Sequence, residues 1–245
     1  YRCFGMPREE AGATDPQQRF LLEQGYEVLH ASGVGRAALH GSPTGVFIGI
    51  ISHDFKVAMS ESVLFINGNL HSIAAGRLAY VFDLHGPSVA IDTGCSSSLV
   101  ACHSTSRALH SDECVLGVAA GVNIILDATV SQGLATMLLT ASRSRVFDVH
   151  ADGYARAEMS AAVLLRPSTH ARVVDGGAPV LASAARQDGR RMNLSAPNGR
   201  AQADLVQACL SLAHLPSERT VRAELSANGS FLGDAVEVRS LSSAT

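Results

Sequence analysis

Apolar residues gather along the chain in two kinds of pattern. Short continuous runs, bounded by glycine, proline or polar residues, are typical of buried strands. Longer stretches with apolar residues three or four positions apart are typical of amphipathic helices. The first pattern predicts strands at 44–51, 86–92, 114–126, 160–167, 178–188 and 222–228, and the second predicts helices within 14–32, 74–86, 96–110 and 201–213.

Strands and helices alternate through most of the chain. This order favours an α/β fold with a largely parallel sheet covered by helices. In the first helix, Thr14 or Asp15 is expected as the N-cap, because Pro16 suits the first helical position. The stretch 167–177 is the best candidate for an internal boundary, and the run at 178–188 is expected to begin a second unit.

Cys95 lies where a predicted strand meets a predicted helix. The sequence AIDTGCSSSL (90–99) leads from an apolar run into a patch of hydroxyl residues, and Gly94 relaxes the backbone just before the thiol. A cysteine at such a turn meets the free N–H groups and the positive dipole end of the helix, which favour thiolate over thiol. Most cysteines, however, are small buried hydrophobic residues. Position alone leaves the roles of nucleophile and packing residue open.

Composition and charge narrow the function classes. The 245 residues are 47% hydrophobic with a net charge of −3, which suits a globular protein and gives no basic field for nucleic acid. No apolar segment reaches the roughly 20 residues needed to span a bilayer, and the start YRCFGMPREE does not resemble a signal peptide. We therefore expect an intracellular protein, in the cytoplasm or an organelle such as a plastid.

The five cysteines are widely spaced and odd in number. They form no CxxC pair and no cluster with histidines at metal-ligand spacing, which argues against a zinc site and a disulfide framework. We expect free thiols in a reducing compartment, and no bound metal or cofactor. The cysteines are Cys3, Cys95, Cys102, Cys114 and Cys209.

Six ordered stretches are similar to the β-ketoacyl synthase family, in particular the ketosynthase domains of modular polyketide synthases and animal-type fatty acid synthases. The stretch DTGCSSSLVA resembles the active-site signature of that family. Together the six stretches span nearly the whole chain. They are DPQQRFLLEQGYEVL (15–29), GVFIGIISHDF (45–55), AAGRLAYVFDLHGPSVAIDTGCSSSLVA (74–101), FDVHADGYARAE (147–158), APNGRAQADLV (196–206) and LGDAVEVRSL (232–241).

The resemblance implies a thiolase-like fold with α-β-α-β-α layers and mostly parallel sheets. Residues 1–167 are then expected to form the N-terminal half that carries the nucleophile, and residues 168–245 to begin the C-terminal half. Relative to the family, the chain is expected to be incomplete at both ends. A homodimer or an assembly partner is also implied, with the strand near 88–92 pairing across the dimer axis.

The reaction implied by the resemblance is a decarboxylative Claisen condensation. Cys95 would take an acyl chain from the phosphopantetheine thiol of an acyl carrier protein or coenzyme A. A malonyl thioester would then lose carbon dioxide, and the resulting carbanion would attack the acyl-enzyme. The backbone N–H of Cys95 is a candidate donor to the thioester oxygen.

The sequence departs from the family at a catalytic histidine. The family pattern E-A-H-G-T-G-T-x-L-G-D corresponds here to AELSANGSFLGD (223–234), with Ser226 in the place of the histidine. A serine hydroxyl is shorter than an imidazole and carries no positive charge, so Ser226 is not expected to replace its function. His214 lies outside the motif. A second family histidine and a nearby lysine would lie beyond Thr245.

Three functions are compatible with these observations. The first is an active β-ketoacyl synthase of polyketide or fatty acid biosynthesis. The second is a condensation-inactive ketosynthase-like protein, in which Cys95 holds an acyl group or the chain has a structural role in a larger assembly. The third is an unrelated cysteine hydrolase, which is the weakest because the sequence has no G-x-S-x-G elbow and no papain-type cysteine context.

Overall fold

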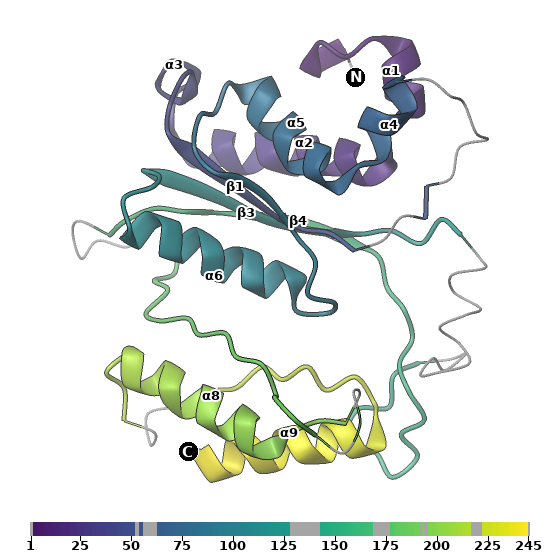
Figure 1. The fold of residues 1–245 in the computed structure, drawn as a ribbon, viewed down its shortest axis with the longest axis vertical. Helices are drawn as coiled ribbons and strands as arrows, with labels where there is room; N and C mark the ends of the chain where they lie inside the picture. The colour runs from purple at the N-terminus through teal and green to yellow at the C-terminus, as the bar shows by residue number, and fades with distance from the viewer. Residues whose placement is uncertain are drawn as a thin grey trace. The chain divides into compact units, whose positions relative to one another are not determined.

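The computed structural model describes residues 2–51, 54–55, 63–127, 143–168, 177–191, 193, 196–216 and 222–244 (Figure 1). The chain forms two compact units, which are described separately below. The first unit comprises Tyr1–Ala128 and Ala157–Ala171, and the second comprises Thr129–Arg156 and Arg172–Thr245. The division into two family halves at 167/168 stays a prediction.

A four-stranded sheet forms the centre of the first unit. Its strands lie in the order β2-β1-β3-β4. Each strand overlaps a predicted apolar run, so these four strand predictions are confirmed. The strands are β1 Thr44–Gly49, β2 Ser88–Ile91, β3 Leu116–Asn123 and β4 Met159–Leu165.

The sheet is mixed, with three parallel strands and one antiparallel strand. β1 pairs in parallel with both β2 and β3. β4 runs antiparallel to β3, with Val118 opposite Leu164. The expectation of a largely parallel sheet is therefore confirmed, with β4 as the one antiparallel strand among those described.

The strands differ in burial according to their place in the sheet. All six residues of β1, in the middle, are buried. β2 pairs only with β1 among the described strands, and its residues Ser88 and Val89 are exposed. The expectation of a strand within 86–92 is confirmed, but the expectation that it is buried is wrong. An edge strand has a neighbouring strand on one side only, which leaves part of it exposed.

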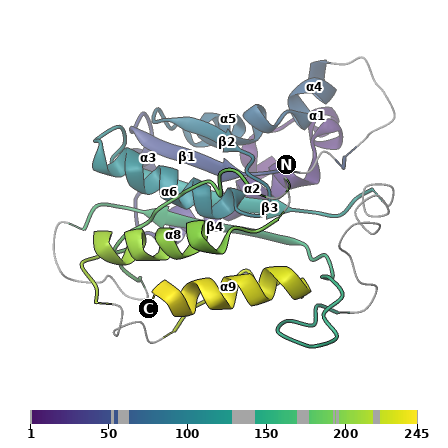
Figure 2. The ribbon, with the colours of Figure 1, turned by 60° about the horizontal axis from the view of Figure 1, so that its bottom comes forward.

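Helices cover both faces of this sheet (Figures 1 and 2). α2 (Pro16–Ala31) and α5 (His71–Phe82) lie on one face, where their apolar side chains share a core with Val46 and Ile48 of β1. α6 (Ser97–His110) lies on the other face. The other helices among the described residues of this unit are η1 Arg2–Phe4, α1 Arg8–Ala13, α3 Arg36–Leu39 and α4 Val63–Asn69.

The start of α2 resolves the choice between two predicted caps. Asp15 is the N-cap, because its carboxylate oxygen Oδ1 accepts a hydrogen bond of 2.8 Å from the backbone N–H of Gln17. Pro16 occupies the first helical position as expected. A side-chain cap of this kind contributes about 1 kcal/mol to helix stability.

Two glycines bring α6 into close contact with the sheet. Gly49 of β1 lies opposite Gly121 of β3 in the strand register. A Cβ atom at Gly49 would lie 2.6 Å from the backbone nitrogen of Ser98, and one at Gly121 would lie 2.7 Å from the Cβ of Ser98. Any side chain at either position would push the first turn of α6 off the sheet, so these glycines determine where the helix begins.

The described part of the second unit contains two helices that pack against each other, α8 (Gly199–Leu212) and α9 (Phe231–Ala244) (Figure 2). α8 confirms the predicted helix at 201–213. The predicted strands at 178–188 and 222–228 are wrong, because both segments are described and neither forms a strand. A strand needs a partner for its backbone hydrogen bonds, and no described strand pairs with these two segments.

The contact between the sheet and α6 predicts the effect of a single added methyl group. Gly49→Ala is expected to lower the free energy of unfolding by about 1–3 kcal/mol, because the new Cβ meets backbone atoms that cannot rotate away. Urea unfolding measures the change. The matched control is Gly76→Ala in α5, where no atom lies within 4 Å of the added carbon. That substitution should leave stability unchanged or raise it by up to about 1 kcal/mol. Equal losses for both variants would contradict the prediction.

Candidate active site

Cys95 lies in the turn that joins β2 to α6. β2 ends at Ile91 and α6 begins at Ser97, so the predicted position between strand and helix is confirmed. Gly94 has a φ of +68°, a left-handed conformation that glycine adopts without steric cost. The Cys95 side chain is exposed. The thiol is therefore accessible to a reactant from solution.

Polar side chains on both sides of Cys95 hold this turn in place. The Asp92 carboxylate accepts a hydrogen bond of 3.1 Å from the Gly94 backbone N–H. The buried Ser97 hydroxyl accepts one of 2.9 Å from the Thr93 N–H and donates one of 2.7 Å to the Gly94 carbonyl. The Ser96 hydroxyl donates to the Thr93 carbonyl at 3.0 Å. The hydroxyl patch in the sequence thus fixes the backbone that carries the thiol.

The start of α6 provides an electrostatic environment for negative charge. The helix has 14 residues, and the side chain of its N-cap residue, Ser96, makes no capping hydrogen bond. Helix N-terminal N–H groups carry partial positive charge and attract anions. A thiol placed immediately before such a helix is suited to nucleophilic attack on a thioester, with backbone N–H groups nearby to stabilise an oxyanion.

The other cysteines occupy different environments. Burial raises the pKa of the Cys102 thiol and of the Cys114 thiol above the ordinary cysteine value. Cys3 is exposed in η1, and Cys209 is half-buried in α8. Among the residues that the structure describes, no group of histidine, cysteine and acidic side chains is arranged to hold a metal ion.

Ser226 lies in the second unit, in the loop that precedes α9, and its side chain is exposed. Its backbone N–H donates a hydrogen bond of 2.8 Å to Oε1 of Glu237, and the N–H of Ala227 donates one of 2.9 Å to Oε2 of the same carboxylate. His214 is the exposed residue that follows the C-cap of α8, and it has a left-handed backbone. Residue 226 thus belongs to a loop that α9 holds by its backbone.

Sequence reasoning did not identify the residues that fix these two loops. Asp92 and Ser97 hold the turn around Cys95, while Asp234 and Glu237 hold the loop around Ser226. For Asp92 and Ser97 a signal was present, because a carboxylate or hydroxyl residue two to four positions from a glycine often bonds to the backbone of a turn. Asp234 and Glu237 lie five or more positions from the N–H groups of the loop before α9 that they bind, so no such spacing marks them. Which backbone N–H groups donate to these side chains depends on the conformation of the loop, and the sequence pattern does not show that conformation.

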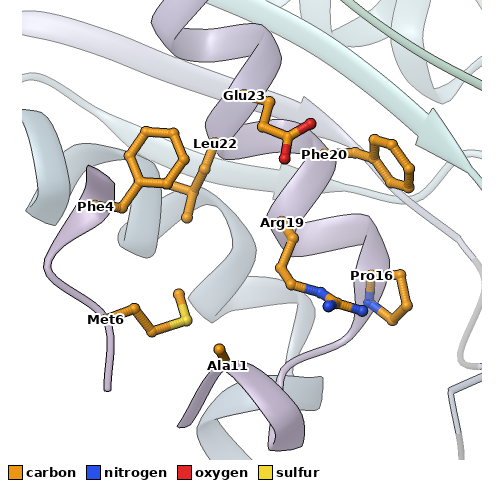
Figure 3. Close-up of a pocket in the computed structure, with 8 residues that line it drawn as sticks. All are labelled: Phe4, Met6, Ala11, Pro16, Arg19, Phe20, Leu22 and Glu23. Atoms are coloured by element: carbon orange, nitrogen blue, oxygen red, sulfur yellow. The ribbon is translucent and has the colours of Figure 1, made fainter. Parts of the chain in front are cut away.

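The first unit also contains a cavity of about 270 Å³ beside α2 (Figure 3). Its lining is mainly apolar and includes no cysteine or histidine, and only Arg19 and Glu23 carry charge. α2 covers the face of the sheet opposite to α6, so this cavity is separate from the turn that carries Cys95. The described helices include none that is both long and apolar enough to cross a membrane.

Known proteins similar to this chain include curated polyketide synthases. The hybrid PKS-NRPS synthetase pydA of Acremonium sp is 39% identical over 255 aligned positions, which cover 98% of this chain and 6% of that protein. The non-reducing polyketide synthase olcA of Penicillium canescens is 42% identical over 213 positions, which cover 83% of this chain and 9% of that protein. The chain therefore spans less than a tenth of the length of these two relatives.

Solved structures with the same fold include ketosynthase domains of bacterial synthases. The oxazolomycin ketosynthase domain from Streptomyces albus JA3453 superposes with a TM-score of 0.90 at 36% identity, over 99% of this chain and 43% of that chain. The ketosynthase from module 6 of the bacillaene synthase of Bacillus subtilis superposes with a TM-score of 0.86 at 28% identity, over 98% and 43%. These similarities confirm the expected thiolase-like α/β fold.

Two domain families match the sequence in succession. Residues 1–171 match the N-terminal domain of β-ketoacyl synthases, and residues 178–245 match the C-terminal domain of the same enzymes. These matches, the polyketide synthase relatives and the ketosynthase structures agree with the signature around Cys95. The chain therefore belongs to the β-ketoacyl synthase family, as a ketosynthase domain of the polyketide synthase type.

Proposed function

We propose that this chain accepts an acyl group on Cys95 from a phosphopantetheine thioester, presented by an acyl carrier protein or as coenzyme A. The observation that carries the proposal is the exposed thiol in a turn fixed by hydrogen bonds, directly before the N-terminus of a 14-residue helix. The relatives named above are polyketide synthases, which supports a polyketide intermediate as the acyl group.

The acylation step exchanges one thioester for another. The Cys95 thiolate attacks the carbonyl carbon, a C–S bond to Sγ forms, and the C–S bond to the phosphopantetheine sulfur breaks. The proton lost by Cys95 is taken up by the departing thiolate, so charge and atoms balance. During the attack the carbonyl oxygen becomes negative, and the backbone N–H of Cys95 is the proposed donor that stabilises it.

Condensation makes a further chemical demand, which residue 226 does not meet with an imidazole. Loss of carbon dioxide from a malonyl thioester creates an enolate, which needs a hydrogen-bond donor or positive charge at its oxygen. Ser226 occupies the position at which the family resemblance places a histidine. A serine hydroxyl reaches less far and stays neutral. We therefore propose that acylation of Cys95 is retained while decarboxylative condensation is slow.

A partner at the edge of the sheet is part of the proposal. Of the strands that the structure describes, β2 pairs with β1 alone, and Val89 on β2 is 40% exposed. An unpaired edge with exposed apolar side chains is a surface on which a second strand can add. These features support pairing with a second copy of the chain through 88–92.

The reactivity of the thiols tests the proposed nucleophile. At neutral pH, iodoacetamide should label Cys95 about tenfold or more faster than Cys102 and Cys114, whose burial and raised pKa both reduce the accessible thiolate. Labelling of those two should increase as the pH rises above the ordinary pKa of cysteine. Mass spectrometry after limited alkylation measures each site. Cys3 is the internal control, because it is exposed but precedes no long helix. Labelling of Cys95 no faster than Cys3 would contradict activation by α6.

A mass-spectrometric assay with acyl- and malonyl-carrier protein tests the proposed reaction. Acyl-enzyme should form on Cys95, while β-ketoacyl product should form about 10²–10³ times more slowly than expected for an imidazole at residue 226. Cys95→Ala should abolish both species, and Cys209→Ser, which changes a thiol on α8, should leave acylation unchanged. Product at ordinary turnover would refute slow condensation. The absence of acyl-enzyme would refute the nucleophile and favour a structural role.

A further inference from the structure

The first two turns of α9 carry two carboxylates that face the loop before the helix. Glu237 binds the N–H groups of Ser226 and Ala227, one with each of its oxygens, at 2.8 and 2.9 Å. Asp234 binds the N–H of Gly229, which lies 3.2 Å from both of its oxygens. Three backbone N–H groups between 226 and 229 thus point at carboxylates of one helix. Charge-assisted hydrogen bonds of this kind are stronger than those between neutral groups.

Asp234 also ties the loop to a second part of the same unit. Its carboxylate is buried, and Oδ2 accepts a further hydrogen bond of 3.1 Å from the N–H of Phe147. The N–H of Gly153 donates to the carbonyl of Gly229 at 3.0 Å. The segment 147–153 and the loop before α9 are therefore held together at two points, and Asp234 takes part in one of them.

The backbone of the loop needs this support. Ala227 has a φ of +36° and Gly229 has a φ of +82°, and both are left-handed conformations. Ala227 carries a Cβ atom, which makes such a conformation unfavourable unless the surroundings impose it. A Cβ atom at Gly229 would lie 2.5 Å from the carbonyl oxygen of Gly153. The two carboxylates thus bind the N–H groups of residues on both sides of a strained turn.

We infer that Glu237 and Asp234 are positioning residues, which fix the backbone at residue 226 whatever side chain that residue carries. The hydrogen bonds that Glu237 and Asp234 accept from the loop use backbone N–H groups and not the hydroxyl of Ser226, so replacement of this side chain leaves that support unchanged. The inference rests on the proposed function in one respect, namely that residue 226 acts on the acyl or malonyl thioester. Its consequence is that Ser226→His alone would present an imidazole from a loop that is already in place.

Hydrogen exchange tests the positioning role without any catalytic readout. In the full chain, the N–H groups of Ser226 and Ala227 should exchange at least about tenfold more slowly than in Glu237→Ala, as measured by NMR or by mass spectrometry. Glu237→Gln, which keeps one acceptor oxygen, should give intermediate rates. Glu224→Ala is the matched control, because Glu224 lies in the same segment with an 87% exposed side chain. It should leave the rates at 226 and 227 unchanged.

The exchange rates of α8 show whether each variant is folded. If Glu237→Ala speeds exchange throughout α8 as well, that variant is partly unfolded and Glu237→Gln is compared with the parent instead. Glu237→Gln must then show faster exchange at 226 or 227 while the exchange rates of α8 stay unchanged. Rates at 226 and 227 that are equal in the parent, Glu237→Gln and Glu237→Ala would overturn the inference. An equal effect of Glu224→Ala would overturn it too, because the protection would then not depend on the carboxylate of Glu237.

The variant Ser226→His tests whether the positioned loop can support the decarboxylation reaction. Decarboxylation of malonyl thioester should rise about tenfold to a hundredfold, part of what one preorganised donor contributes. Adding Glu237→Ala should remove most of this gain through kcat and leave KM little changed, because the loop orients the imidazole and does not bind substrate. Slow exchange at residues 226 and 227 without any gain from Ser226→His would refute the part of the proposed function that attributes slow condensation to Ser226, and it would leave the positioning role intact. A gain that survives Glu237→Ala would overturn the positioning role.

Discussion

The contact of two glycines with the first turn of α6 is the constraint on which the site depends. Gly49 and Gly121 lie opposite each other in the sheet, and neither has room for a Cβ atom beneath Ser98. The helix can therefore lie directly on the strands, which places the turn before it at the carboxyl end of β2. The position of the Cys95 thiol therefore depends on Gly49 and Gly121, two residues without side chains that lie more than twenty positions away in the sequence.

Side-chain carboxylates perform a comparable task in the loops of both units. Asp92 fixes the turn at Gly94, and Glu237 and Asp234 fix the loop from 226 to 229. In each case an acidic residue accepts from backbone N–H groups that no regular element satisfies. The support of both loops therefore comes from residues other than Cys95 and Ser226. The side chain of Ser226 takes no part in the hydrogen bonds that Glu237 and Asp234 accept from its loop.

The sequence predicted the central elements well and the loops poorly. The runs at 44–51 and 114–126 were recognisable because a buried strand is apolar throughout, and the position of Cys95 followed from the strand and helix around it. The run at 178–188 begins with apolar residues but forms no strand, since pairing depends on partners elsewhere in the chain. α4 (Val63–Asn69) was missed because its sequence, with two asparagines and a glycine, has weak helix propensity. The roles of Asp234 and Glu237 depend on backbone conformation, which periodicity does not reveal.

The order in which the chain contributes to its two units constrains how such a domain can be divided or recombined. The backbone passes from one unit to the other at 128/129, at 156/157 and again at 171/172. A cut at the first passage would remove β4 from the sheet and leave β3 without its antiparallel neighbour. A cut at the last would deprive Asp234 of the N–H of Phe147. No single crossover in the gene separates the units cleanly, so exchange between synthases that preserves both must transfer them as one block.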